Sequence, residues 1–229
     1  MRILHLYPDL MNLYGDYGNL AVLKKHLEDQ GLEVVIDRKD ISESIDFDRY
    51  DMVYMGSGTE RNQEIALKEL MKYKHYLKKA VGNNKVILFT GNAMEVMGKA
   101  IDDKEALGFV DFTVETTEKR YTGDVIVRNE EIGDVVGFIN RSTLIHGGEK
   151  EKLFGYDFRY ETLPDNEYEG YRINNLFGTH IIGPVLVKNP NFMRTIVRLF
   201  VNDAYQEITY PYEEDAYNTT LEQLRKRKK

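Results

Sequence analysis

The chain contains a strand-to-helix turn of the kind that positions a nucleophile. Residues 85–90 (KVILFT) form an apolar run typical of a buried strand, and residues 91–98 (GNAMEVMG) continue with the pattern of a short helix. A sharp turn at such a junction pushes its apex residue out of the sheet, beside the unpaired N–H groups of the helix start. Those groups stabilise an oxyanion or a thiolate, as acyl transfer requires. The apex residue is Gly91, which has no side chain to attack with.

Composition limits what else the chain can do. None of the 229 residues is cysteine, so no thiol replaces the missing nucleophile, and disulfides and thiolate metal sites are excluded. The five histidines show no i, i+4 pair, and we expect neither a metal nor a cofactor. A net charge of −7, with no basic stripe outside residues 225–229, argues against nucleic acid as a partner. No apolar stretch is long enough to span a membrane, and the lack of cysteine is compatible with a cytoplasmic location.

Three side chains near the turn are candidates for a replaced chemistry. Thr90 carries a hydroxyl, but it ends the strand and is expected to point into the packing of the sheet. His180 shares a strand face with Ile182 if that segment is extended, although a hydrogen-bonded structural histidine is the default interpretation. Glu95 follows the turn and either reaches the pocket or takes a solvent-facing or cap-stabilising position.

The elements that position these residues follow from the hydrophobic pattern. Apolar runs at 2–7, 32–36, 51–55 and 85–90 predict strands, and helical spacing at 20–30 and 63–80 predicts helices between them. This alternation predicts an α/β fold with a mostly parallel sheet and helices on both faces. The short β-like runs 109–114, 121–127, 135–138, 153–160 and 177–187 predict antiparallel return strands. Helices are expected at 191–205 and 213–228, the second more polar and loosely attached, which divides the chain into a domain at 1–205 and an extension at 206–229.

Several segments resemble a known family in order and spacing. They are residues 12–19 (NLYGDYGN), 56–63 (GSGTERNQ), 120–124 (RYTGD), 137–140 (GFIN) and 178–184 (GTHIIGP). Together they are similar to the class I glutamine amidotransferases of the cobyric-acid-synthase type, above all to the glutaminase subunits of lipid II isoglutaminyl synthases (GatD type). The resemblance implies a three-layer, flavodoxin-like fold.

The departures from this family concern its reactive residues. In such enzymes a cysteine at the turn attacks the glutamine side chain, a histidine shuttles the proton, and ammonia passes to a partner. The cysteine position matches Gly91 and the histidine position matches Ile182, while Glu95 stands where the family has glutamine. Acyl transfer needs a nucleophile and a base within hydrogen-bond reach, and losing the nucleophile costs on the order of 10⁶ in rate in a serine protease. We therefore predict a protein inactive as a glutaminase, with a preserved, unstrained turn and with Ile182 filling part of the pocket.

The resemblance also assigns substrate-binding positions. It implies that Arg120 holds the substrate carboxylate, whereas a surface ion pair is the plain alternative. Gly56 and Gly58 either offer backbone N–H groups to a substrate or only permit the turn after a strand. Gln63 and Asn92 complete the implied set.

Three functions remain open at this point. The first is a non-catalytic partner subunit for a Mur-ligase-like protein (MurT type), which in the family amidates the glutamate of the peptidoglycan stem peptide with ATP. The second is a module that binds glutamine or glutamate without hydrolysing it. The third is a hydrolase with replaced chemistry based on Thr90, Glu95 or His180.

Overall fold

The first half of the chain alternates buried strands with helices, as its pattern predicts. The computed structural model describes residues 1–228. Its first elements are β1 (Arg2–Leu6), α1 (Tyr17–Asp29), β2 (Val35–Lys39), β3 (Met52–Met55), α2 (Glu60–Leu70), α3 (Lys74–Gly82) and β4 (Val86–Thr90). The single helix expected at 63–80 is thus two helices, separated by a 3-10 turn at Met71–Tyr73.

The second half contains more strands than expected, and two of them, β7 (Phe112–Asn129) and β8 (Gly133–Gly147), are much longer than expected. The other strands are β5 (Ala100–Ile101), β6 (Lys104–Glu105), β9 (Lys152–Arg159), β10 (Tyr168–Ile173) and β11 (Leu176–Thr179). The runs 109–114 and 121–127 were expected as separate strands, but residues 112–114 and 121–127 belong to the single strand β7. The polar residues between them remain extended because β7 pairs with β8 along nearly its whole length, with one irregularity between Thr116 and Tyr121.

The C-terminal elements also differ from expectation. The structure has α4 (Val185–Lys188), α5 (Pro190–Val201) and α6 (Pro211–Arg227). The strand predicted at 177–187 ends at Thr179, because Gly183 has a positive φ of 80° and Pro184 leads directly into α4. The helix predicted at 191–205 ends at Val201, where Asn202 has a φ of 46°.

The order of the strands in the sheet brings the loops after several parallel strands together at one edge of the sheet. The order is β2-β1-β3-β4-β11-β10-β9-β7-β5-β6, with β8 paired to β7. The strands β2, β1, β3, β4 and β11 are parallel, and β9, β10 and β11 pair antiparallel. This is the flavodoxin-like order, in which ligands bind outside the carboxyl ends of the strands where the order reverses. The loops after β1, β3, β4 and β11 meet there.

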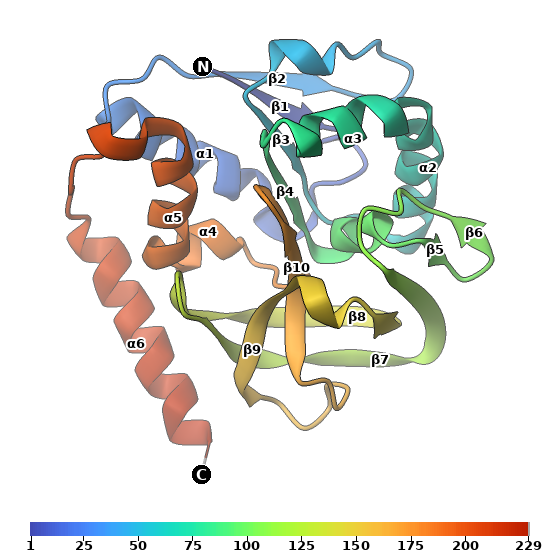
Figure 1. Cartoon of the computed structure of the whole chain (residues 1–229). Helices are drawn as coiled ribbons and strands as arrows, with labels where there is room; N and C mark the ends of the chain where they lie inside the picture. Colours follow the sequence, from blue (N-terminus) through green and yellow to red (C-terminus); the bar gives the residue numbers. More distant parts are fainter. Residues whose placement is uncertain (229) are drawn as a thin grey trace.

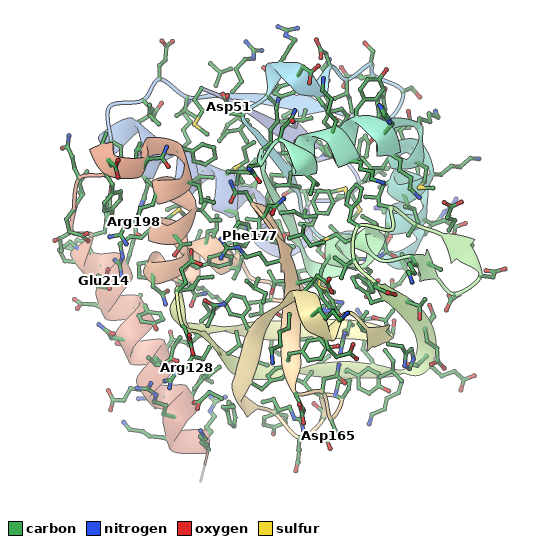
Figure 2. The ribbon with its side chains drawn as sticks, viewed as in Figure 1. Asp51, Arg128, Asp165, Phe177, Arg198 and Glu214 are labelled. Carbon is green, nitrogen blue, oxygen red and sulfur yellow. The ribbon has the colours of Figure 1, made fainter. Side chains whose placement is uncertain are left out.

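Two hydrophobic clusters lie on the two faces of the parallel strands. One joins the sheet to α2 and α3, and the other joins it to α1, α4 and α5, on the opposite side in Figure 1. Phe177 of β11 is fully buried and lies near the middle of the molecule in Figure 2. The three-layer α/β fold is therefore confirmed. Within residues 1–228, no helix has the length and apolar character needed to cross a bilayer.

The C-terminal helix α6 is firmly attached, so the expectation of loose attachment is wrong. Leu221 and Leu224 are buried in a cluster with Ile126 and Val136 of the β7–β8 hairpin. Basic residues of the helix and its C-cap form ion pairs with acidic residues of the strands: Arg225 with Asp134, Arg227 with Asp124 and Lys228 with Asp157. Figure 1 shows α6 running from the level of α5 down to these strands.

This packing predicts the effect of truncating one side chain of α6. Leu224→Ala should lower the free energy of unfolding by about 2 kcal/mol and speed amide hydrogen exchange in α6, because a buried aliphatic side chain is lost. Lys226→Ala is the matched control, since Lys226 is exposed and pairs with Glu222 of the same helix. Equal exchange rates in the two variants would contradict the docking of α6 through its apolar side chains.

Candidate functional site

A small polar cavity lies at the carboxyl ends of the parallel strands. Its volume is about 20 Å³. Its lining comes from the loops after β1, β3 and β4 and from the β7–β8 hairpin, and includes Tyr14, Ser57, Asn92, Glu95, Arg120 and Arg141. A volume of this size holds one or two water molecules. The cavity therefore has a binding site's position in the fold but not its size.

The predicted turn is present at the end of β4. Gly91 begins a 3-10 turn that runs to Met97, and its φ of 60° lies in the region that favours glycine. A Cβ atom placed on Gly91 would lie 2.5 Å from both Cβ and Oγ of Ser57 and 3.1 Å from Cγ2 of Ile182. Two neighbouring side chains thus fill the space in front of the apex. Ile182 lies there as predicted from the sequence.

Ser57 is the site residue that the sequence analysis missed. Its side chain is buried, and its Oγ donates to Asn92 Oδ1 at 3.3 Å. Its backbone N–H donates to Asp16 Oδ2 at 2.5 Å. Burial raises the pKa of Asp16 to about 7, although this hydrogen bond opposes the rise. The available signal in the sequence was the serine itself, which separates Gly56 from Gly58 in the loop after a predicted strand.

The glycine loop has little free hydrogen-bonding capacity to offer a substrate. Gly58 N–H donates to Asn92 Oδ1 at 2.9 Å, and the Asn92 amide donates back to Gly58 O at 3.0 Å. A Cβ on Gly56 would lie 2.8 Å from Met11 O, and one on Gly58 would lie 2.9 Å from Leu10 O. Close packing against the loop after β1 therefore accounts for both glycines, and Asn92 ties this loop to the turn after β4.

Glu95 lies at the centre of a buried polar network. It is 2% exposed, so its expected solvent-facing alternative is wrong. Its Oε1 accepts from Thr143 Oγ1 at 2.5 Å and lies 3.1 Å from His180 Nε2, while its Oε2 accepts from Gln63 Nε2 at 2.7 Å. Burial would raise the pKa of Glu95, but hydrogen bonds from His180, Thr143 and Gln63 hold it below its usual range. Gln63 thus belongs to this network.

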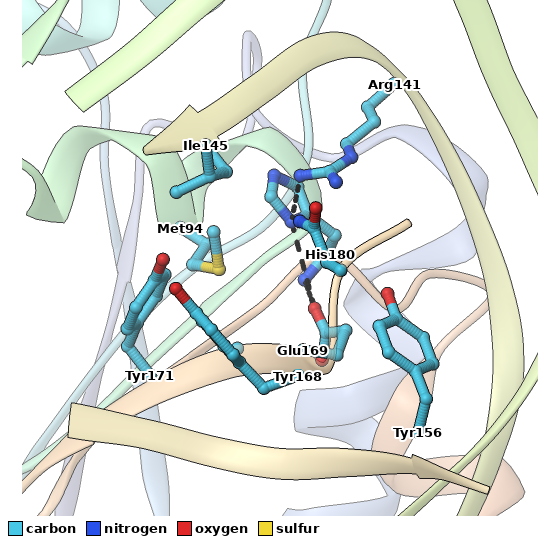
Figure 3. A pocket seen from close by; sticks show the side chains of 10 residues that line it. Met94, Arg141, Ile145, Tyr156, Tyr168, Glu169, Tyr171 and His180 are labelled. Carbon is cyan, nitrogen blue, oxygen red and sulfur yellow. Dashed lines mark hydrogen bonds and ion pairs between the residues drawn. The ribbon is translucent and has the colours of Figure 1, made fainter. Parts of the chain in front are cut away.

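His180 bridges Glu95 to Arg141. Figure 3 shows its imidazole beside Arg141, with Nδ1 3.3 Å from Arg141 Nη1. Burial and the charge of Arg141 lower the pKa of His180 to about 4, so the ring is neutral near pH 7. The Nε2–H then donates to Glu95 and Nδ1 accepts from Arg141. The backbone N–H of His180 donates to Glu169 Oε1 at 2.6 Å, and burial raises the pKa of Glu169 to about 7.

The three candidates for replaced chemistry do not form one reactive group. Glu95 and His180 are brought together, but Thr90 Oγ1 lies 3.0 Å from Tyr54 OH in a separate buried contact. The hydroxyl nearest the pair, that of Thr143, donates to the carboxylate. Within residues 1–228 no hydroxyl is hydrogen-bonded to a ring nitrogen of His180. His180 and Ile182 both follow the end of β11 at Thr179, and Ile182 forms an isolated bridge with Phe138, so the two residues do not lie within one strand.

Arg120 lies at the mouth of the cavity in an ion pair. Its Nη1 lies 3.3 Å from Glu60 Oε1, and its Nε donates to Asn140 Oδ1 at 2.6 Å. The side chains of Arg120 and Glu60 are 50% and 59% exposed. Asn140 in turn donates to Tyr14 OH at 3.2 Å. The ion pair weighed as the plain alternative for Arg120 is therefore formed, and it covers the cavity.

The contact between Ser57 and the apex predicts a coupled effect of two substitutions. Gly91→Ala should lower the free energy of unfolding by about 2–4 kcal/mol, because the methyl group meets Ser57 and the backbone keeps a positive φ. Adding Ser57→Gly should restore about half of the loss. Gly155→Ala is the control, since a Cβ there has no atom within 4 Å. Additive effects of the two substitutions in urea denaturation would contradict the contact.

Neutral burial of His180 predicts a pH dependence of stability. Its folded pKa of about 4 lies below the ordinary 6.5, so the unfolded chain binds the extra proton between these values. His180 should therefore contribute a loss of unfolding free energy as the pH drops from about 6.5 to about 4, while Asp16 and Glu169, whose folded pKa values are raised to about 7, contribute in the opposite direction. His180→Asn should remove the His180 contribution and so shift the pH slope of stability relative to the unmodified protein. The exposed His75→Asn is the control and should keep the wild-type slope. If the stability of His180→Asn and of His75→Asn depends on pH with the same slope, the fold does not hold the imidazole of His180 neutral.

Comparisons with known proteins agree with this fold. Residues 2–190 match the family of CobB/CobQ-like glutamine amidotransferase domains. Subunit GatD of the glutamine-hydrolysing lipid II isoglutaminyl synthase from Staphylococcus aureus (strain N315) is 33% identical over 198 residues, which cover 82% of this chain and 79% of that protein. The corresponding subunit from Streptococcus pneumoniae (strain ATCC BAA-255 / R6) is 29% identical over 225 residues, with coverages of 94% and 86%.

Solved structures share the fold at much lower identity. PurLQS from Thermotoga maritima superposes with a TM-score of 0.59 at 14% identity, covering 86% of this chain and 98% of that one. A crystal structure of a glutamine amidotransferase gives a TM-score of 0.57 at 17% identity, with coverages of 86% and 97%. At these identities the likeness concerns the fold alone. The match over residues 2–190 and the identity with GatD extend it to the sequence, and the chain belongs to the CobB/CobQ-like glutamine amidotransferase family.

Proposed function

We propose that this chain is a GatD-type subunit that no longer hydrolyses glutamine and that acts in the cytoplasm, in peptidoglycan amidation, as the partner of a Mur-ligase-like protein of the MurT type. The observation that carries the proposal is the packing of Ser57 and Ile182 against Gly91. These side chains take up the space in which a nucleophile on Gly91 and its base would meet. The similarity to two GatD subunits supports the choice of pathway and partner.

Several features oppose glutamine hydrolysis at once. The apex has no nucleophile, and the N–H groups of Ser57 and Gly58 already donate to Asp16 and Asn92. An oxyanion site requires donors that are free to point at the developing charge. The imidazole of His180 is engaged by Glu95 and Arg141, with no hydroxyl in contact. A hydrolase with replaced chemistry is therefore not favoured.

A role as a partner subunit needs the scaffold, and the scaffold is intact. The parallel sheet, the turn at Gly91 and the loop after β3 are all present. Such a subunit stabilises or regulates the ligase without supplying ammonia from glutamine, so the ligase uses free ammonia or performs another condensation.

Restoring the reactive pair tests the loss of activity. Gly91→Cys with Ile182→His should remain inactive, because the cysteine Cβ would lie 2.5 Å from Ser57. Adding Ser57→Gly should produce measurable ammonia release from glutamine when the ligase partner is present. The unmodified protein and the double variant serve as controls. Glutamine hydrolysis by the unmodified protein would overturn the proposed inactivity.

A pull-down tests the partnership separately. The full chain, co-expressed with a Mur-ligase-like protein from the same genome, should purify as a complex, and the triple variant should do so equally. A subunit that stays alone while the ligase amidates its substrate unaided would contradict the proposed partnership.

A further inference from the structure

Within residues 1–228, the buried guanidinium of Arg141 forms no direct ion pair with a carboxylate. Arg141 lies on β8 and is 7% exposed. Its Nη1 contacts His180 Nδ1, but its Nε–H is buried and has no hydrogen-bond partner within residues 1–228. A buried charge without a paired group is costly, and each such donor in a native structure calls for an explanation.

The two buried carboxylates beside His180, those of Glu95 and Glu169, accept hydrogen bonds from other donors. Glu95 accepts from Thr143, His180 and Gln63. Glu169 accepts from the Thr179 hydroxyl at 2.7 Å and from the backbone N–H of His180. Within the described residues, no carboxylate lies within 4.0 Å of a nitrogen of Arg141, whereas most other arginines have such an ion pair.

Arg141 lines a cavity that a second arginine, Arg120, also lines. It lines both the 20 Å³ cavity and a neighbouring cavity of about 10 Å³, shown in Figure 3. Arg120 lines the first of these at its mouth. The two residues come from adjacent strands, since Arg141 pairs with Tyr121, the neighbour of Arg120. One guanidinium therefore lies at the floor of the cavity and the other at its entrance.

Glu60 shows what kind of group fits the entrance. Its Oε1 lies 3.3 Å from both Arg120 Nη1 and Ser142 Oγ. The carboxylate of Glu60 thus occupies the position at the entrance where the carboxylate of a ligand would contact Arg120. The floor offers a fork of N–H donors, which suits a second carboxylate better than a neutral amide.

We propose that this pocket binds a small dicarboxylate, with one carboxylate on Arg141 and the other on Arg120 in place of Glu60. The closed cavity is too small for such a ligand, so the rim must open. The rim consists of exposed side chains, among them Glu60 and Tyr14, which is 43% exposed. Opening therefore requires side-chain movement at the surface and no rearrangement of the sheet. Glu60 acts as an internal competitor of the ligand.

Calorimetry on the purified full chain tests the proposal, with glutarate and L-glutamate as probes at constant ionic strength. Both should bind saturably. Acetate, with one carboxylate, and L-glutamine, with a neutral amide, should bind at least tenfold more weakly. Arg141→Gln should weaken glutarate binding at least tenfold, and Glu60→Gln should strengthen it by removing the competitor. Arg38→Gln is the control, because Arg38 pairs with Asp9 outside the cavity.

Two results would overturn the site. One is the same heat for glutarate as for acetate in the unmodified protein, and the other is undiminished glutarate binding by Arg141→Gln. If Arg141→Gln does not fold, Arg141→Lys keeps the charge without the fork and should weaken glutarate binding while folding normally. The test needs no ligase and no glutaminase activity, so its outcome is independent of the proposed partnership.

Discussion

The packing of two turns against each other governs this site. The turn after β4 brings Gly91 against Ser57 of the turn after β3, and Ile182 closes the contact from the segment after β11. Because interiors are packed as densely as organic crystals, an atom added at one of these positions must displace an atom at another. The three residues are therefore one structural unit. The absence of a side chain at Gly91 and the presence of one at Ser57 are physically linked.

Beside this unit, the polar network follows from the cost of burying charge. Glu95 is almost fully buried, and it stays ionised because three donors converge on it. His180 stays neutral because burial and Arg141 both oppose its protonation. The neutral imidazole of His180 donates a hydrogen bond to the carboxylate of Glu95 and accepts one from the guanidinium of Arg141. In this arrangement the Nε–H of Arg141 has no hydrogen-bond partner within residues 1–228.

The sequence predicted the parts of the fold that depend on local pattern. The order of strands and helices in the first half was predicted, since alternating apolar runs and glycine stops are local signals. The division of residues 63–80 into α2 and α3 and the start of β2 at Val35 were not. The turn at Gly91 was recovered because a strand, a glycine and a short helix adjoin in the chain. The continuous strand from Phe112 through residue 127 was not predicted, since β7 is held extended by its partner β8 rather than by its own composition. The attachment of α6 was missed for a similar reason, because its acidic partners lie far away in sequence.

Within the site, the sequence indicated which residues are important more readily than it indicated which side chains surround them. Gly91 and Ile182 stood out because they depart from a pattern at known positions. Glu95 was read as partly solvent-facing because its neighbours in sequence give no sign of Thr143 and His180, which arrive from β8 and from the end of β11. Ser57 was passed over because a serine between two glycines is ordinary in a turn. Its effect depends on a distance to Gly91 that only the folded chain defines.

The attachment of α6 has a consequence for the order of folding during synthesis. Leu221, Leu224 and the basic residues after them are synthesised about eighty residues after the strands that they cover. Until then the outer side of the β7–β8 hairpin, with Ile126 and Val136, is exposed to water and to other nascent chains. Once α6 docks, it covers this apolar strand surface and removes a site for self-association.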